Sequence, residues 1–223
     1  MYQPVIKKQW IQDSILNSFS GMYLTMLSIM QGVAMSLLAG KVPVTKTAWQ
    51  SISAHGIEYL MMCLLTLIII IVLWHSYFWL AVIASWTPLI WDSLFMFSIG
   101  AIELIAIKSI GSTGWFYAIG LLGIVGGHQY KYNVKRLPME SWSAKPNDNA
   151  EDIGQWIRDY KTRRGENLLK LSEVLFLVTA LFDICSLFKF PFFTWILLAA
   201  ILAGQIWAIA KHISDQKETL NRI

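Results

Sequence analysis

The chain has 223 residues, of which 56% are hydrophobic and 14% are charged, and its mean hydropathy is +0.51. Soluble domains carry about 25% charged residues, so this composition excludes a disordered chain and argues against a water-soluble domain. The net charge of +4 then serves to orient the chain in a bilayer rather than to bind nucleic acid. We predict an all-α polytopic membrane protein that is surrounded by lipid and binds no nucleic acid directly.

Largely apolar stretches with few charges predict about six transmembrane helices. A helix needs about 20 largely apolar residues to cross about 30 Å of hydrocarbon. The stretches that approach or meet this length lie, in chain order, at residues 14–39, 58–75, 79–107, 115–130, 171–188 and 192–210. The first four form a region over residues 1–130, and the last two form a hairpin over 171–211, ahead of a tail at 212–223.

The second and third spans share one uncharged run of 33 residues between Glu58 and Asp92. This run is too long for one straight span and too short for two. We place the break at the aromatic cluster at residues 74–79, because amphipathic rings favour the headgroup level. Asp92 then lies about midway along the third span.

Residues 131–170 predict a cytoplasmic loop. Its first half is rich in Ser, Pro and Asn, whereas the second half opens with two acids and then spaces its apolar residues helically. This pattern predicts an amphipathic helix at about 151–162. The helix either lies on the lipid headgroups or docks a cytoplasmic protein partner. The docking candidates are Trp156, Ile157, Tyr160, Arg163 and Arg164.

The distribution of basic residues predicts the orientation, since Lys and Arg accumulate in short cytoplasmic loops. With six spans, both termini and residues 131–170 share one side, and that side carries 14 of the 18 Lys and Arg residues. We therefore expect both termini in the cytoplasm. This multi-pass topology suits a bacterial inner membrane, although other membranes stay open.

Acidic residues inside the spans are the candidates for an ion pathway, because an aspartate at a helix centre costs about 2.5–3.5 kcal/mol on the insertion scale. Asp92 lies four residues after Pro88, which would bend the helix, and Glu103 lies eleven residues further on, on nearly the same face. Ser85 extends this face inward, and Asp183 is a second intramembrane acid in the fifth span.

These acids also have structural interpretations. Asp92 and Asp183 are alternatively hydrogen-bonded packing residues, and Glu103 alternatively pairs with Lys108 or with another chain.

Small residues at four-residue spacing predict close helix packing, either within one subunit or between subunits of a homo-oligomer. They are Ser28, Gly32, Ser36 and Gly40 in the first span, Gly123 and Gly127 in the fourth, and Ala200, Gly204 and Ala208 in the sixth. Gln31 and Gln205 add hydrogen-bonding groups that are placed to link the first and sixth spans.

Motifs for catalysis or cofactor binding are missing from the sequence. It has no Walker motif, no HExxH and no TVGYG-like filter, and neither Asp92 nor Asp183 lies in a GxGD motif. Cys63 and Cys185 lack metal-ligand spacing. We expect that the protein is not an enzyme and that it binds no metal or cofactor. We favour a small homo-oligomeric ion or proton channel. The alternative is a non-conducting sensor or anchor that recruits a cytoplasmic partner through residues 131–170.

Overall fold

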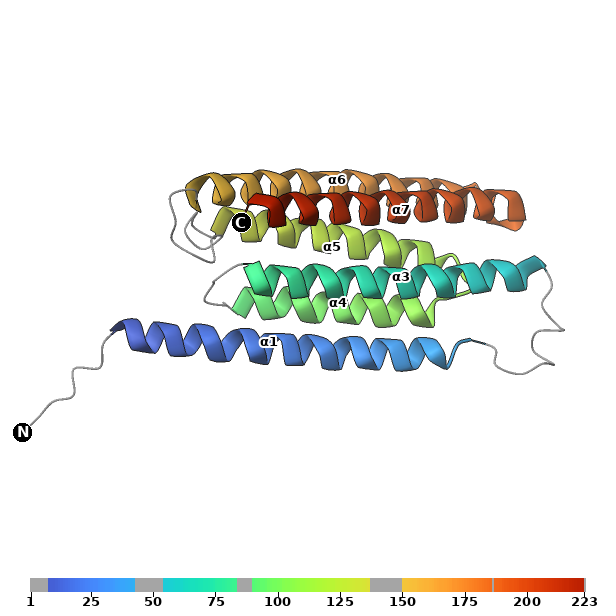
Figure 1. Ribbon diagram of the computed structural model, residues 1–223. Coiled ribbons are helices and arrows are strands. Elements are labelled where there is room, and N and C mark those ends of the chain that lie inside the picture. Colours follow the sequence, from blue (N-terminus) through green and yellow to red (C-terminus); the bar gives the residue numbers. More distant parts are fainter. Residues whose placement is uncertain (1–7, 43–53, 84–89, 137–149, 186, 223) are drawn as a thin grey trace, which may run out of the picture.

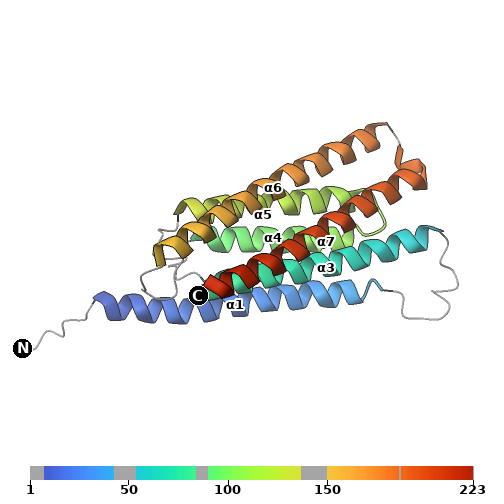
Figure 2. The same ribbon diagram turned by 45° about the horizontal axis from the view of Figure 1, so that its top comes forward.

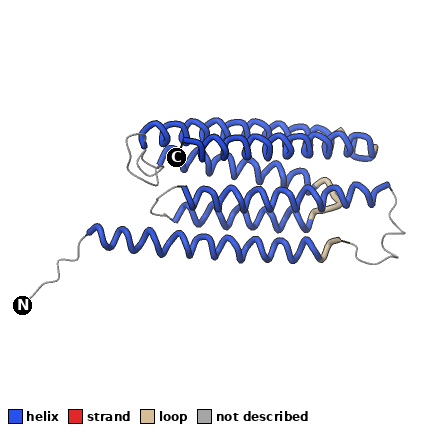
Figure 3. The backbone as a smooth tube through the Cα atoms, in the orientation of Figure 1, coloured by secondary structure: helices blue, strands red, loops and turns tan. Residues whose placement is uncertain are grey.

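The computed structural model describes residues 8–42, 54–83, 90–136, 150–185 and 187–222. These residues form six α-helices and one 3₁₀ helix, with no strand among them (Figure 3). In chain order the elements are α1 Lys8–Ala39, α3 Ala54–Ile83, α4 Ile90–Lys108, α5 Gly114–Arg136, α6 Ala150–Ile184, η2 Leu187–Lys189 and α7 Pro191–Arg222. The predicted all-α class is therefore confirmed for these ranges.

The helices lie alongside one another in a bundle (Figures 1 and 2). α1 contacts α3 and α4, α4 contacts α5, and α5 contacts α6. Only η2 and a few flanking residues separate α6 from α7, yet α7 packs chiefly against α3. The start of α1 and the end of α7 lie toward the same end of the bundle, and the turn between α4 and α5 lies at the opposite end (Figure 1).

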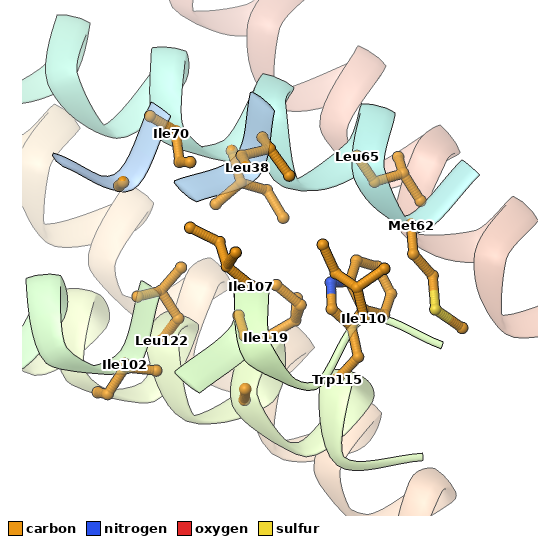
Figure 4. Packing of buried hydrophobic residues seen from close by; sticks show 14 of the residues in the cluster. Leu38, Met62, Leu65, Ile70, Ile102, Ile107, Ile110, Trp115, Ile119 and Leu122 are labelled. Atoms are coloured by element: carbon orange, nitrogen blue, oxygen red, sulfur yellow. The ribbon is translucent and has the colours of Figure 1, made fainter. Parts of the chain in front are cut away.

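A hydrophobic core fills the space between α1, α3, α4 and α5 (Figure 4). Trp115, at the start of α5, is fully buried there. Its Nε1 donates a hydrogen bond to Thr66 Oγ1 at 2.9 Å, and the Thr66 hydroxyl donates in turn to the carbonyl of Met62 at 2.7 Å. The indole can therefore lie in the core without an unsatisfied donor.

The bundle leaves long apolar segments uncovered. Gly56–Ser76 of α3 and Phe192–Lys211 of α7 are long and apolar enough to cross a membrane, and Leu24–Ala39 of α1 is a shorter apolar stretch. Only 33% and 22% of the two long segments are buried inside the chain. Because the core helix of a water-soluble protein buries most of its apolar face, this exposure favours lipid around both segments.

The predicted break at the aromatic cluster is wrong, because α3 continues through residues 74–79 to Ile83. The next helix, α4, begins at Ile90, and residues 84–89, which include Ser85 and Pro88, lie outside the described residues. Bulky aromatic side chains do not disturb helical backbone hydrogen bonds, so an aromatic cluster by itself does not end a helix.

The predicted boundaries around residues 131–170 also change. α5 continues to Arg136, and α6 runs unbroken from Ala150 to Ile184, so the expected amphipathic helix at 151–162 and the fifth span at 171–188 are parts of one helix. No proline lies between residues 150 and 184 to stop it. Residues 137–149, within the expected loop, lie outside the described residues.

The α5–α6 interface depends on glycines. A Cβ atom on Gly127 would lie 2.5 Å from Leu169 Cγ and 3.1 Å from the Gly165 carbonyl oxygen of α6. A Cβ atom on Gly123 would meet the side chain of Ser172, with its Cβ at 2.8 Å. Gly123 and Gly127 thus allow the two backbones to approach within one chain, as small residues do between helices in lipid.

We expect Gly123→Ala to destabilise the protein by about 1–3 kcal/mol, because the added methyl group overpacks the contact with Ser172. Thermal unfolding in detergent measures the effect. The matched control is Gly21→Ala in α1, where a Cβ atom would meet nothing within 4 Å. That variant should hold or raise the unfolding temperature, since alanine favours a helix. Equal loss in both variants would contradict the assigned interface.

Candidate functional site

The inner face of α4 holds two acidic side chains, Asp92 and Glu103, each only 2% exposed. They lie eleven residues apart, which separates them by about 16 Å along the helix axis. Asp92 belongs to the first turn of α4 rather than to the middle of a span, because the helix begins at Ile90. An acid is favourable there, since the helix N-terminus carries partial positive charge.

Glu103 contacts Gln31 of α1. Gln31 Nε2 lies 3.1 Å from Oε1 and 3.0 Å from Oε2 of the Glu103 carboxylate, within hydrogen-bond distance of both. Gln31 is 6% exposed and shares the inner face of α1 with the buried side chains of Leu27, Ala34 and Leu38. The amide is therefore the polar group of this face that meets α4.

The other amide atom of Gln31 is unsatisfied. Its Oε1 is buried and has no hydrogen-bond partner among the described residues. A glutamine amide offers two donor hydrogens and one acceptor, and a carboxylate can accept but cannot donate. The Gln31–Glu103 contact thus satisfies the donor side of the amide and leaves its acceptor without a match.

α1 and α4 approach closely beside this pair. A Cβ atom on Gly100 would overlap the end of the Met30 side chain. Met30 lies one residue before Gln31, and Gly100 lies three residues before Glu103. This apolar contact therefore adjoins the hydrogen-bonded contact between Gln31 and Glu103. A glycine on α4 therefore makes room for the α1 side chain next to the buried acid.

Side chains of α3 contact both the residues that follow α1 and the turn between α4 and α5, which lie at one end of the bundle. Tyr59 donates its hydroxyl hydrogen to the carbonyl of Lys41 at 3.1 Å, just after α1. Its ring lies against Gly111, whose φ of +88° suits glycine, in the turn between α4 and α5. The Gly111 N–H group also contacts Met62 Sδ at 3.3 Å. Glu58, in the preceding position on α3, is buried, and its Oε1 lacks a partner among the described residues.

The remaining predicted pathway residues do not join this face. Asp183 is exposed near the end of α6, not buried, and the Tyr117 hydroxyl donates to its Oδ2 at 3.4 Å. The sequence analysis expected Asp183 inside a span that continued to residue 188. The helix instead ends at Ile184, one residue after Asp183. Ser85 and Pro88 lie outside the described residues.

The small residues of α1 lie on its outer face. Ser28, Gly32 and Ser36 are exposed, Gly40 is exposed just after the helix, and a Cβ atom on Gly32 would meet nothing within 4 Å. They do not pack against other helices as Gly123 and Gly127 do. In α7, Ala200 is exposed, whereas Gly204 and Ala208 are half-buried, with Gly204 facing Leu171 of α6.

The predicted docking residues fall in the first part of α6. Arg163 is exposed, and its Nε donates to the carbonyl of Asp159 at 3.3 Å. The side chains of Trp156, Ile157, Tyr160 and Arg164 lie outside the described part of the structure, although their backbone is helical.

Gln31 meets a different helix from the one expected. Gln31 and Gln205 were expected to link the first and sixth spans, whereas the Gln31 amide contacts Glu103 of α4. The spacing of apolar residues around Gln31 indicates that it faces inward, but a periodic pattern does not name the opposing helix.

Within the described ranges, no group of three or more His, Cys, Asp or Glu residues is arranged to hold a metal ion. Cys63 is buried and Cys185 is exposed, and both are free thiols. A comparison with known protein families, curated proteins and solved structures finds no match.

We expect Gln31→Leu to destabilise the protein by about 1–3 kcal/mol, because it leaves the buried Glu103 carboxylate without its donor. The double variant Gln31→Leu/Glu103→Leu should recover most of this loss, since apolar pairs replace buried polar pairs at little cost. Unfolding free energies in detergent measure the coupling. Gln205→Leu, at a half-buried position of α7, is the control. Additive effects of the two single substitutions would contradict a direct interaction.

Proposed function

We propose that the chain is an integral membrane protein that conducts protons or small cations, and that the acidic face of α4 lies along the pathway. The observation that supports this proposal is the burial of Asp92 and Glu103 on one helix inside a bundle with extensive apolar surface. Carboxylates inside a membrane are costly, and they mark ion pathways and proton relays in transport proteins.

The length of the acidic face agrees with this role. Asp92 and Glu103 lie about 16 Å apart, roughly half of the about 30 Å thickness of a hydrocarbon core. Asp92 stands at the start of α4, and Glu103 lies five residues before its end at Lys108. A cation that leaves water at either end therefore needs to travel only a short distance to reach a carboxylate.

The proposed topology has six transmembrane helices, with both termini in the cytoplasm of a bacterial cell. The proximity of the first and last helical turns to one end of the bundle supports an even number of crossings (Figure 1). The bias of Lys and Arg supports the orientation. The exposed small residues of α1 support assembly as a homo-oligomer, because such faces allow helices of neighbouring subunits to pack closely.

Ion flux into liposomes containing the purified protein tests the proposal. We expect wild type to dissipate a proton or cation gradient, and Asp92→Asn to slow this flux about tenfold or more, as a barrier rise of about 1.4 kcal/mol would do. Glu103→Gln should act in the same direction. Asp159→Asn, the same substitution at an exposed carboxylate of α6, is the matched control and should conduct normally.

Flux that is unchanged in Asp92→Asn and Glu103→Gln would remove the acidic face from the pathway. If the wild-type protein conducts nothing across pH and membrane potential, the conduction proposal fails.

The alternative function is a non-conducting sensor or anchor that recruits a cytoplasmic protein. The continuity of α6 supports it, because one rigid helix joins the docking candidates to the segment that packs on α5. Replacing Trp156 and Tyr160 by alanine should then abolish capture of a partner by the membrane-embedded protein. Leu177→Ala, at an exposed apolar position farther along α6, is the control. Capture that survives the double substitution would exclude this docking surface.

A further inference from the structure

We propose that Glu103 is a proton-binding carboxyl group and that the Gln31 amide rotates to match its two protonation states. The proposal deepens the function above, since it names the proton as the species that the acidic face binds. It rests on the burial of both side chains, on their contact, and on the unmatched acceptor of the amide.

The observed arrangement is the one expected for the deprotonated state. Gln31 turns its Nε2 donor toward both oxygens of Glu103 and turns its Oε1 acceptor away. A carboxylate has no hydrogen to donate, so the Gln31 acceptor cannot be matched by it. In this arrangement Glu103 is the acceptor and Gln31 is the donor.

The protonated state favours the opposite orientation of the amide. When a proton from the aqueous phase binds, an O–H bond forms on one Glu103 oxygen, and the carboxyl group becomes a donor. A half-turn about the last side-chain torsion of Gln31, which has two broad preferred orientations, exchanges Nε2 with Oε1. Gln31 Oε1 then accepts from the carboxyl group, and the pair is hydrogen bonded in both states without any movement of α1 or α4.

The surroundings favour a proton over a metal cation. Hard cations such as Ca²⁺ and Mg²⁺ take six or more oxygen ligands. The pair offers the carboxylate and one amide oxygen, and the inward-facing neighbours one turn away on the two helices are apolar, namely Leu27, Ala34, Ile99 and Ile107. A proton needs only one acceptor and one partner for the hydrogen that it brings.

Other titratable groups lie at this end of the bundle, and each helix that packs against Gln31 and Glu103 contributes at least one of them. They are Lys41 after α1, Glu58, Tyr59 and Cys63 on α3, Lys108 on α4 itself and Tyr117 on α5. Among the described residues, the side chain that is hydrogen bonded to Glu103 is that of Gln31. The two-state contact is therefore assigned to this pair.

Infrared difference spectra of the full-length protein in liposomes, recorded on acidification, test the proposal directly. We expect a carboxylic-acid C=O band that is lost in Glu103→Gln and moves in frequency in Glu103→Asp, which keeps an acid if the first variant does not fold. Gln31→Leu should raise the frequency of the band, because the acid loses its hydrogen-bond acceptor. Gln31→Asn keeps an amide and tests whether a hydrogen bond restores the lower frequency. Asp159→Asn, which removes an exposed carboxylate of α6, should leave the band in place.

A band that survives in Glu103→Gln would overturn the assignment of the proton to Glu103. An unchanged frequency in Gln31→Leu would overturn the role of the amide and would point to a different hydrogen-bond partner, such as water. If Na⁺ or K⁺ at constant pH abolishes the band, a metal cation competes for the site and the preference for protons is wrong. These spectra do not require flux, so a protein that shows the expected bands but conducts nothing would refute conduction alone.

Discussion

Polar groups buried in this bundle are costly unless they find partners within it, because the helices expose apolar side chains to their surroundings. The contact between Gln31 and Glu103 is where this requirement is most demanding. Each partner lies on the inner face of a different helix, and each would be costly to bury alone. Their pairing fixes the depth at which α1 meets α4 and determines the chemistry of the α1–α4 interface.

The two sides of the bundle are held together by different physical means. On one side, Gly123 and Gly127 let α5 and α6 approach closely over several turns, and contacts between atoms replace the hydrophobic effect that lipid does not supply. On the other side, α1 combines apolar packing with a single amide–carboxylate contact, while its small residues remain on the outer surface. The proposed proton-binding pair thus lies in the interface between α1 and α4.

The helix boundaries do not follow every sequence signal. The run between Glu58 and Asp92 contains an aromatic cluster, and α3 continues through it. Aromatic enrichment indicates where a helix lies relative to the lipid headgroups and does not interrupt its backbone. Likewise, the charges after Ala150 predicted an aqueous segment separate from the next span, although charge alone does not interrupt a helix and α6 is continuous.

The sequence by itself determined the helical class, the apolar character of the segments and the placement of Asp92 and Glu103 on one helical face. These properties depend on composition and on a period of 3.6 residues, which are local quantities. Only the tertiary structure decided that Gln31 meets Glu103, that the small residues of α1 face outward while those of α5 face α6, and that Asp183 is exposed. A periodic pattern defines the faces of one helix, but which helix lies opposite each face depends on how all the helices pack together.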